Sequence, residues 1–445
     1  MKNEVFTIIN GDFIDISKMK KILQDMNTVD IAEVFDDLSK EKIIQLFRIL
    51  PKNIAADVFA YVDSEQQKVI IETLTDIEIG EVMSELFVDD AVDFIEEMPA
   101  SVVTRVLANV PAERREVINQ LLKYPKNSVG SIMTTEFIYL KVSHKVARAF
   151  EVIRKRGIKK ETIYTCYIID ENRKLVGTAS IRDLLLAEQD QDITEVMDTN
   201  VIFANTMDDK ETLAINFNKY DFLAMPVVDN EHRLVGIVTV DDALDVQEQE
   251  ATEDIEIMAA ITPSHEPYLK TSVLTLTKNR VVWLLVLMLT ATLTAIIIEG
   301  FEDAIMVFPA LVAFIPMLMD TGGSAGSQSA VLIIRGMALN EVRKRDILLV
   351  FWKEIRVAAL CGAALVAVNF GRVMIMNQDF VLALVTSLAL YATVIMAKTV
   401  GCLLPIGARL IKMDPAVMAS PVITTIADVL SLIIYFNLAR IIMNI

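Results

Sequence analysis

A sharp change of composition near residue 270 constrains this fold more than any other feature of the sequence. Residues 1–269 carry 50 acidic and 28 basic side chains, a net charge of −22, while residues 270–445 carry 10 and 14, a net charge of +4. The second part is nearly uncharged and strongly apolar. An acidic surface of this size repels nucleic acid and suits cations, although solubility alone also accounts for it. The sequence therefore predicts soluble domains followed by a membrane domain, with no nucleic-acid partner.

Five apolar stretches after residue 270 are candidate membrane spans. The first, 281–298, has no charged residue in 18 positions, which is enough for one spanning helix. The second, 304–334, has Asp320 as its only charged residue and would measure about 46 Å as a single helix. Because that exceeds a bilayer core, we expect a bend or break near its glycines. The remaining stretches are 347–371, 380–408 and 415–443.

The loop charges orient these stretches. Basic residues lie before the first stretch, after the second and after the fourth, whereas the 299–304 segment after the first is acidic. The positive-inside rule then places the N-terminus in the cytoplasm and, with five spans, the C-terminus outside. The start of the chain lacks the apolar core of a signal peptide, and the three widely spaced cysteines indicate no disulfide framework.

Asp428 lies near the middle of the fifth stretch, with no basic residue close in sequence. A carboxylate at that depth is expensive, so its usual place is a water-filled pathway or a paired site. The alternative is a protonated carboxyl that hydrogen-bonds a neighbouring helix. Thr424 shares a helix face with Asp428, and no histidine follows His265 to favour a softer metal. These features suit hydrated Mg²⁺, which prefers oxygen ligands and gives up its water reluctantly.

Residues 130–247 contain an internal repeat. The segment 131–155 recurs at 195–219 and the segment 167–186 recurs at 226–245, so that two "LVG" triplets lie 59 residues apart. Each unit is predicted to contain a helix, two strands and a second helix. The units resemble a tandem pair of CBS (cystathionine β-synthase) domains, in which two sheets pack back to back and often sense a small ligand.

Upstream of this repeat, residues 1–129 repeat a short pair of amphipathic helices, which predicts a stacked, solenoid-like helical domain. Asp89 and Asp93 fall on one face of such a helix at i,i+4. Like charges in this arrangement repel one another, and a bound cation would reverse that repulsion, although a plain solvated face is the alternative.

The segment 239–270 joins the repeat to the first apolar stretch and is very acidic. It crowds seven carboxylates into fourteen residues with no basic residue among them: Asp241, Asp242, Asp245, Glu248, Glu250, Glu253 and Asp254. Apolar residues at helical spacing continue to Ile261, which predicts a helix at the membrane mouth. A flexible acidic linker is the alternative.

The order of these parts resembles the MgtE family of magnesium channels or transporters over nearly the full length. The motifs that carry the resemblance are "FIPMLMDTGGSAGSQS", "KMDPAVMASPVITTIADVLSLIIYF" and the acidic end of the CBS repeat. Ser324 stands where many members of the family have Asn. The resemblance implies a multidomain fold with an all-α superhelical N-terminal domain (1–129), an α/β CBS pair (130–188 and 189–246), an acidic connecting helix (247–272) and a five-span α-helical membrane domain (273–445).

The resemblance also implies a homodimer in the lipid of the cell membrane, with one pore lined by the second and fifth spans. Asp428 then corresponds to the residue that captures hydrated Mg²⁺. Cytosolic Mg²⁺ in the family bridges carboxylates and closes the pore. The matching positions here are Asp89, Asp93, Glu211, Asp221, Asp242, Asp245, Glu253 and Asp254, with Asp414 at the inner entrance of the fifth span.

We therefore expect a Mg²⁺ channel or transporter that is closed by cytosolic Mg²⁺ and is not an enzyme, with Mg²⁺ as both cargo and regulator. No nucleotide-hydrolysis motif of the form GxxxxGK[ST] occurs in the sequence. Two alternatives stay open. One is a CBS-regulated transporter of another solute, and the other is a membrane-anchored sensor whose CBS pair binds an adenine nucleotide.

Overall fold

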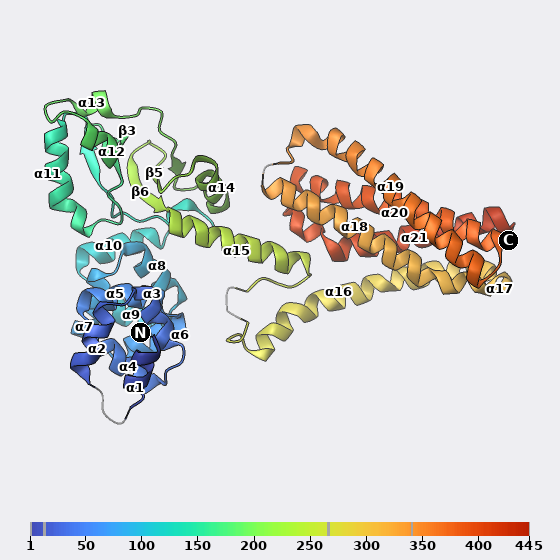
Figure 1. The fold of residues 1–445 in the computed structure, drawn as a ribbon, viewed down its shortest axis with the longest axis horizontal. Helices are drawn as coiled ribbons and strands as arrows, with labels where there is room; N and C mark the ends of the chain where they lie inside the picture. Colours follow the sequence, from blue (N-terminus) through green and yellow to red (C-terminus); the bar gives the residue numbers. More distant parts are fainter. Residues whose placement is uncertain (1, 12–14, 265–267, 340, 445) are drawn as a thin grey trace. The chain divides into compact units, whose positions relative to one another are not determined.

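A computed structural model describes residues 2–11, 15–264, 268–339 and 341–444 of the chain. The fold divides into two compact units, residues 1–247 and residues 248–445. The first unit contains short helices and two small sheets, and the second contains long helices (Figure 1).

Short amphipathic helices build the first part of unit 1, as the repeat predicted. Each helix packs mainly on the second one along the chain, as α3 does on α5, α5 on α7 and α6 on α8, which gives a two-layered superhelix. Proline at the N-cap starts α5, α9 and α10, because Pro51, Pro99 and Pro111 cannot continue a preceding helix. The helices are α1 (Lys2–Ile9), α2 (Ile16–Gln24), α3 (Thr28–Phe35), α4 (Lys40–Ile49), α5 (Lys52–Tyr61), α6 (Ser64–Thr73), α7 (Asp76–Glu85), α8 (Val88–Glu97), α9 (Ala100–Asn109) and α10 (Ala112–Leu121).

The CBS repeat forms two three-stranded sheets, in the orders β1-β2-β3 and β4-β5-β6. In each sheet the first pair is parallel and the second antiparallel. The elements are η1 (Val129–Ser131), β1 (Tyr139–Lys141), α11 (Val146–Arg156), η2 (Gly157–Lys159), β2 (Thr165–Ile169), β3 (Leu175–Ser180), α12 (Ile181–Leu186), α13 (Ile193–Val196), β4 (Ala204–Asn205), α14 (Lys210–Tyr220), β5 (Ala224–Val228) and β6 (Leu234–Thr239). Residues of both sheets, including Tyr167 and Ile237, share one apolar cluster. This cluster fits the predicted back-to-back packing.

The repeated "LVG" triplets have a steric cause. A Cβ at Gly236 would lie 2.9 Å from the carbonyl oxygen of Thr134, and one at Gly177 would lie 3.1 Å from that of Asp198. In both sheets the glycine lets a neighbouring segment of the chain pair closely beside the strand. The sequence prediction missed strands β1 and β4 because runs of three and two residues are too short to show an alternating pattern.

The acidic helix α15 runs over Val240–Met258, not over the predicted 247–272. It starts earlier because Thr239 and Asp242 cap its first turn, with Thr239 Oγ1 donating to Asp242 Oδ2 at 2.6 Å. It ends where Ala260 takes a positive φ of 56°. Residues 259–264 and 268–272 are not helical, and residues 265–267 of the predicted helix lie outside the described part.

Long apolar helices build unit 2: α16 (Val273–Gly300), α17 (Glu302–Val307), η3 (Pro309–Phe314), α18 (Ile315–Ala338), η4 (Lys344–Asp346), α19 (Ile347–Met376), α20 (Phe380–Leu410), η5 (Pro415–Met418) and α21 (Ser420–Met443). By length and apolarity, four stretches of the described residues could cross a membrane, namely α16, α19, α20 and the stretch Pro415–Met443. The predicted count of five is therefore not confirmed. Helix α18 is not among the four because Asp320, Gln328 and its small residues make it more polar.

The second predicted span is broken, but not at its glycines. Helix α17 ends at Val307, the tight helical turns of η3 begin at Pro309, and α18 then runs unbroken through Gly322, Gly323 and Gly326. Prolines rather than glycines mark the break, since Pro309 opens η3 and Pro316 lies in the first turn of α18. The expectation of a break near the glycines was therefore wrong.

The glycines of α18 instead allow close packing against α20 and α21. A Cβ at Gly322 would lie 2.8 Å from Ser431 Oγ, one at Gly323 2.9 Å from Thr424 Cγ2, and one at Gly326 2.6 Å from Ile423 Cγ2. A Cβ at Gly401 of α20 would collide with the carbonyl oxygen of Gly326 and lie 3.1 Å from its Cα. Small residues at helix contacts are the usual means of close association in a membrane.

Replacing Gly401 by Ala should therefore weaken the fold of the apolar bundle. A Cβ at Gly407 of the same helix would meet no neighbouring atom within 4 Å, so Gly407→Ala is the matched control. We expect Gly401→Ala to lower the Tm of the detergent-purified chain by several degrees, because overpacking a tight contact costs about 1–3 kcal/mol. Gly407→Ala should leave the Tm within about one degree or raise it slightly. Equal Tm values for the two variants would contradict the close contact.

Candidate functional site

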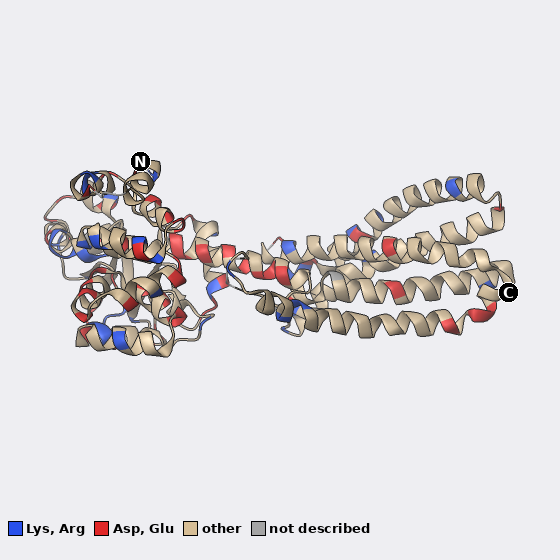
Figure 2. Cartoon of the chain, turned by 90° about the horizontal axis from the view of Figure 1, so that it is seen from below, with Lys and Arg blue, Asp and Glu red and all other residues tan. Residues whose placement is uncertain are grey.

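Carboxylates of α8 and of the first turn of α15 form an acidic cluster within unit 1. Helix α8 contributes Asp89, Asp90 and Asp93, and α15 contributes Asp241 and Asp242. Asp89 is 9% exposed, and its Oδ1 has no hydrogen-bond partner among the described residues. The acidic residues along α15 are among those coloured red in Figure 2. Like charges of the two helices thus lie within electrostatic reach of one another.

Three further acids lie within electrostatic reach of this cluster: Asp57, Glu136 and Glu161. Glu136 is compensated, since its Oε1 lies 3.4 Å from Arg114 Nη1 and its Oε2 accepts from the backbone N–H of Val88 at 3.0 Å. Glu161 Oε2, in contrast, is buried and has no partner in the described part of the chain. The cluster therefore contains both satisfied and unsatisfied carboxylates.

Burial and mutual repulsion raise the pKa values of these acids. Burial is the main cause at Asp89, whose pKa lies well above its ordinary value, and Asp242 adds repulsion. The pKa of Asp242 rises to about 7, also chiefly through burial, although hydrogen bonds from Thr239 oppose the shift. Desolvation likewise raises the pKa of Asp90 to about 6 and that of Glu161 to about 8. Burial and neighbouring negative charge thus both favour the protonated forms of these carboxyl groups.

Asp93 shares the α8 face with Asp89 but is exposed. Desolvation by the protein atoms around its carboxyl group, and next the negative charge of Asp242, raise the pKa of Asp93 to about 7. The alternative of a plain solvated face does not describe Asp89, which is buried. A divalent cation with oxygen ligands would convert the repulsion among these acids into attraction.

The other predicted regulatory acids of unit 1 are placed differently. Asp245 lies on α15 one turn beyond Asp242. Glu211 is in the first turn of α14 and Asp221 is the C-cap of the same 11-residue helix, so the two lie about 15 Å apart. Among the described residues, no three Asp, Glu, His or Cys side chains already converge in a geometry that could hold a metal. A cation would have to draw the carboxylates of the cluster closer.

Unit 2 brings two other predicted residues together outside its long apolar helices. Burial, and next the charge of Asp414, raise the pKa of Asp254 to about 6, with Glu250 and Glu253 contributing further repulsion. Asp414 is the N-cap of η5, where its Oδ1 accepts from the backbone N–H of Ala416 at 2.8 Å. The end of α15 and the entrance of the last apolar helix thus form a second acidic pair.

Within the apolar helices, Asp428 of α21 faces α18. Its Oδ1 is buried and has no hydrogen-bond partner among the residues that the structure describes. Asp320 of α18 lies within electrostatic reach of Asp428. Thr424, one turn before Asp428, lies against Gly323. The alternative for Asp428 was a protonated carboxyl that hydrogen-bonds a neighbouring helix. In the described part of the chain, Oδ1 of Asp428 makes no such hydrogen bond.

Sequence reasoning missed several members of the unit 1 cluster as site residues. Asp90 and Asp241 stand beside predicted acids in the similar strings "VDDAVD" and "VDDALD", and that likeness was an available signal. Glu161 follows two lysines in a turn, where nothing local marks it. Asp320 was left out of the metal residues because Asp428 has the more central position in its span, and no sequence pattern shows that the two acids lie near each other.

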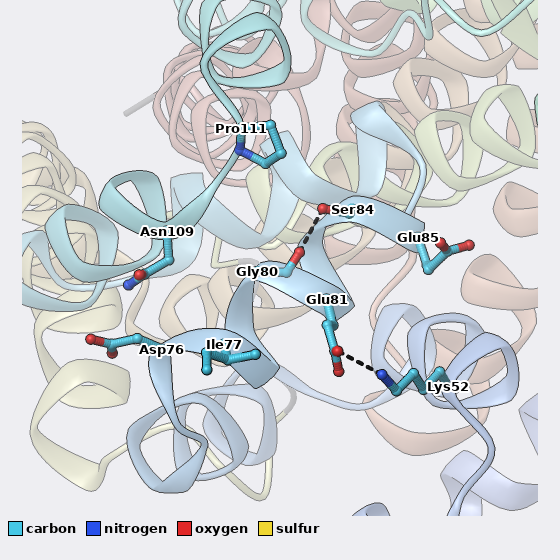
Figure 3. A pocket seen from close by; sticks show the side chains of 9 residues that line it. All are labelled: Lys52, Asp76, Ile77, Gly80, Glu81, Ser84, Glu85, Asn109 and Pro111. Atoms are coloured by element: carbon cyan, nitrogen blue, oxygen red, sulfur yellow. Dashed lines mark hydrogen bonds and ion pairs between the residues drawn. The ribbon is translucent and has the colours of Figure 1, made fainter.

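An open groove of about 800 Å³ lies elsewhere on the helical domain (Figure 3). It is lined by Lys52, Asp76, Ile77, Gly80, Glu81, Ser84, Glu85, Asn109 and Pro111. Lys52 Nζ pairs with Glu81 Oε1 at 2.6 Å, and Ser84 Oγ donates to the carbonyl of Gly80 at 2.6 Å. None of the predicted site residues lies in this groove.

Fold and site define a class: a multi-pass membrane protein whose apolar helices follow a helical domain and a CBS pair rich in carboxylates. Family models match in the same order, with the MgtE intracellular N domain at residues 26–127, CBS domains at 129–190 and 193–248, and MgtE, described as a divalent cation transporter, at 315–438. The chain belongs to the MgtE family.

Individual relatives agree with this assignment. The chain is 38% identical to the magnesium transporter MgtE of Thermus thermophilus over 73% of this chain and 72% of that protein. It is 35% identical to the magnesium transporter MgtE of Bacillus subtilis over 72% and 70%. A crystal structure of the cytosolic domain of the Mg²⁺ channel MgtE in complex with ATP superimposes with a TM-score of 0.50 at 32% identity, over 52% of this chain and 95% of that one.

The raised pKa of Glu161 predicts how its substitution changes stability. An acid whose folded pKa, about 8, exceeds its unfolded value of 4.5 makes the folded state less stable as pH rises through that interval. In a chelator and at pH 8, Glu161→Gln should therefore raise the free energy of unfolding by about 1–2 kcal/mol, less than the full shift because the side chain is partly solvated. The gain should vanish near pH 5.

Thermal unfolding of the purified chain at several pH values measures this effect. Glu171→Gln is the matched control, since Glu171 is an exposed acid of the same sheet domain. A Glu161→Gln variant that is equally destabilised at pH 5 and pH 8 would contradict the assignment of Glu161 to the repelling cluster.

Proposed function

We propose that the chain mediates Mg²⁺ uptake across the cell membrane as a homodimeric channel or transporter, closed by cytosolic Mg²⁺. In this proposal α17 and α18 together provide the second of five spans, the N-terminus is cytoplasmic and the C-terminus is extracytoplasmic. The observation that carries it is Asp428, a half-buried acid of an apolar helix whose Oδ1 is buried without a hydrogen-bond partner in the described residues and which lies within electrostatic reach of a second acid, Asp320. The named relatives support Mg²⁺ as the cargo.

The chemistry near Asp428 favours a hydrated hard cation. Asp320, Thr424 and Asp428 offer oxygen atoms, and Mg²⁺ keeps most of its water while one or two carboxylates hold it. Two acids near each other in an apolar surrounding repel anions, which opposes the alternative of an anion transporter. The residue pair thus supports a cation path between α18 and α21.

The acidic cluster of unit 1 supports gating by the transported ion. Without a cation, Asp89, Asp93 and Asp242 repel one another, so α8 and the start of α15 are held together against an electrostatic force. Binding of Mg²⁺ would remove that force and favour the closely packed arrangement. A nearly complete switch needs about 5.5 kcal/mol of differential binding, which several weak sites supply jointly. Asp254 and Asp414 provide a further site, with Glu253 beside them.

An adenine nucleotide at the CBS pair is a second proposed ligand. It is supported by the ATP complex of the similar cytosolic domain. Binding of ATP is compatible with transport and would modulate it, whereas the sensor alternative needs no transport at all. Flux through the purified chain without any partner protein separates these two functions.

Loss of the Asp428 charge should abolish most transport. We expect Asp428→Asn to reduce the initial Mg²⁺ flux into proteoliposomes at least tenfold, because the neutral amide attracts a hydrated divalent cation far less than a carboxylate does. Asp303→Asn, which removes an exposed acid of α17, should change the flux by less than twofold. Flux of the Asp428→Asn protein at the wild-type level would exclude Asp428 from the ion path.

Loss of two acids of α15 should weaken closure. In Asp242→Ala combined with Asp245→Ala, we expect the cytosolic Mg²⁺ concentration that halves the current to rise at least tenfold, since fewer carboxylates hold the closed arrangement. Patch recordings at stepped internal Mg²⁺ measure it. A control that removes two exposed acids of the CBS pair, Glu171→Ala with Asp190→Ala, should keep wild-type inhibition. Equal inhibition curves for both double variants would contradict the gating role.

A further inference from the structure

Three polar side chains from three different apolar helices meet inside unit 2. Ser329 of α18 donates from its Oγ to Glu354 Oε2 of α19 at 2.6 Å. Lys398 of α20 donates from its Nζ to the same Ser329 Oγ at 3.4 Å. Ser329 is fully buried and Lys398 is 6% exposed. A base and an acid are therefore joined through one hydroxyl group in the apolar bundle.

The hydroxyl is suited to this position. A serine side chain has one proton to donate and lone pairs to accept, so it can serve a carboxylate and an ammonium group at once. In the described part of the chain, Lys398 and Glu354 make no direct ion pair, and Ser329 is the group that links them. A buried charge without a partner is costly, and pairing through a hydrogen-bonded group reduces that cost.

Ser329 and Lys398 also lie near a close backbone contact of the bundle. Ser329 follows Gly326 by one turn of α18, and Lys398 precedes Gly401 by one turn of α20. The carbonyl of Gly326 lies where a Cβ of Gly401 would be. One patch thus combines a glycine contact, which sets how closely α18 and α20 approach, with a polar link, which sets their register along and around the helix axes.

We propose that Lys398 and Glu354 form a serine-bridged charge pair that positions α18, and with it the acid Asp320, for ion transport. The pair is distinct from the Asp320 and Asp428 acids, and its hydrogen bonds to Ser329 involve neither of them. All three are positioning residues, because none is placed on the ion path. The role in transport rests on the proposed function, whereas the pairing itself does not.

A charge-cancelling cycle tests the pair. Glu354→Gln leaves the buried charge of Lys398 uncompensated and Lys398→Met leaves the half-buried charge of Glu354 uncompensated, while the double variant removes both charges. We expect each single variant to lose at least tenfold of the initial Mg²⁺ flux per folded protein in liposomes, and the double variant to recover to within threefold of the wild type. Lys353→Met, which removes an exposed lysine next to Glu354, is the control and should keep its flux.

The cycle distinguishes positioning by charge from packing alone. Glutamine has nearly the shape of glutamate, so a packing role predicts no effect of Glu354→Gln. Flux of both single variants within threefold of the wild type would overturn the proposal. A double variant whose fold-loss of flux equals the two single fold-losses multiplied together would also overturn it, because the two residues would then act independently.

A second variant keeps the proposal testable if the double variant does not fold. Ser329→Ala retains both charges but removes the bridge, and we expect its flux to fall at least threefold. Thr399→Val is its control, because Thr399 Oγ1 only bonds the carbonyl of Ile395 in its own helix, at 2.7 Å. Equal fluxes of these two variants would overturn the bridge. If the wild-type chain moves no Mg²⁺, the proposed function fails, and the Tm values of the same cycle still decide whether the charges are paired.

Discussion

Unit 2 depends on one close backbone contact, between Gly326 of α18 and Gly401 of α20. Lipid provides no hydrophobic force between helices, so their association depends on van der Waals contact and on hydrogen bonds between them. Glycines let the backbones approach, and the same face of α18 then meets hydroxyl groups of α20 and α21, at Thr393, Thr424 and Ser431. That approach brings Asp320 within electrostatic reach of Asp428, which no property of either helix alone would achieve.

In unit 1, apolar packing opposes electrostatic repulsion, since the fold keeps carboxylates that repel one another within electrostatic reach. The apolar face of α8 buries Val88, Ala91 and Val92, and Asp89 on the same helix lies within electrostatic reach of Asp242 in the first turn of α15. Arg114 compensates Glu136 but not the unsatisfied oxygens of Asp89 and Glu161. Core packing therefore supplies the stability that the carboxylates reduce. In the proposed gating by Mg²⁺, the binding energy of the cation would add to a fold that is already formed.

Much of this fold is readable from residue patterns, while the site is less so. Periodicity predicted the stacked helices, the duplicated sheets and most of the apolar helices, because each pattern reflects burial along one element. A sequence does not show whether a glycine bends a helix or packs it, and the neighbour decides this: Gly326 packs because α20 presents Gly401. Glu161 and Asp57 join the acidic cluster only through the tertiary fold, so no local pattern could identify them. The early start of α15 was readable, since Thr239 and Asp242 have the spacing of a capping pair.

Charges inside such a protein fall into two kinds, and their partners separate them. Glu354 shares a hydroxyl with Lys398, and Glu136 has Arg114 and a backbone N–H, so a cation would have to displace contacts that already stabilise these acids. Asp428 and Asp89 each retain a buried oxygen without a hydrogen-bond partner in the described chain, so a cation would give that oxygen an interaction that it lacks. Because an unmade hydrogen bond is costly when buried, the unsatisfied acids gain most from an ion. The same criterion therefore favours structural roles for Glu136 and Glu354 and supports the ion-binding roles that we propose for Asp89 and Asp428, one of each in either unit.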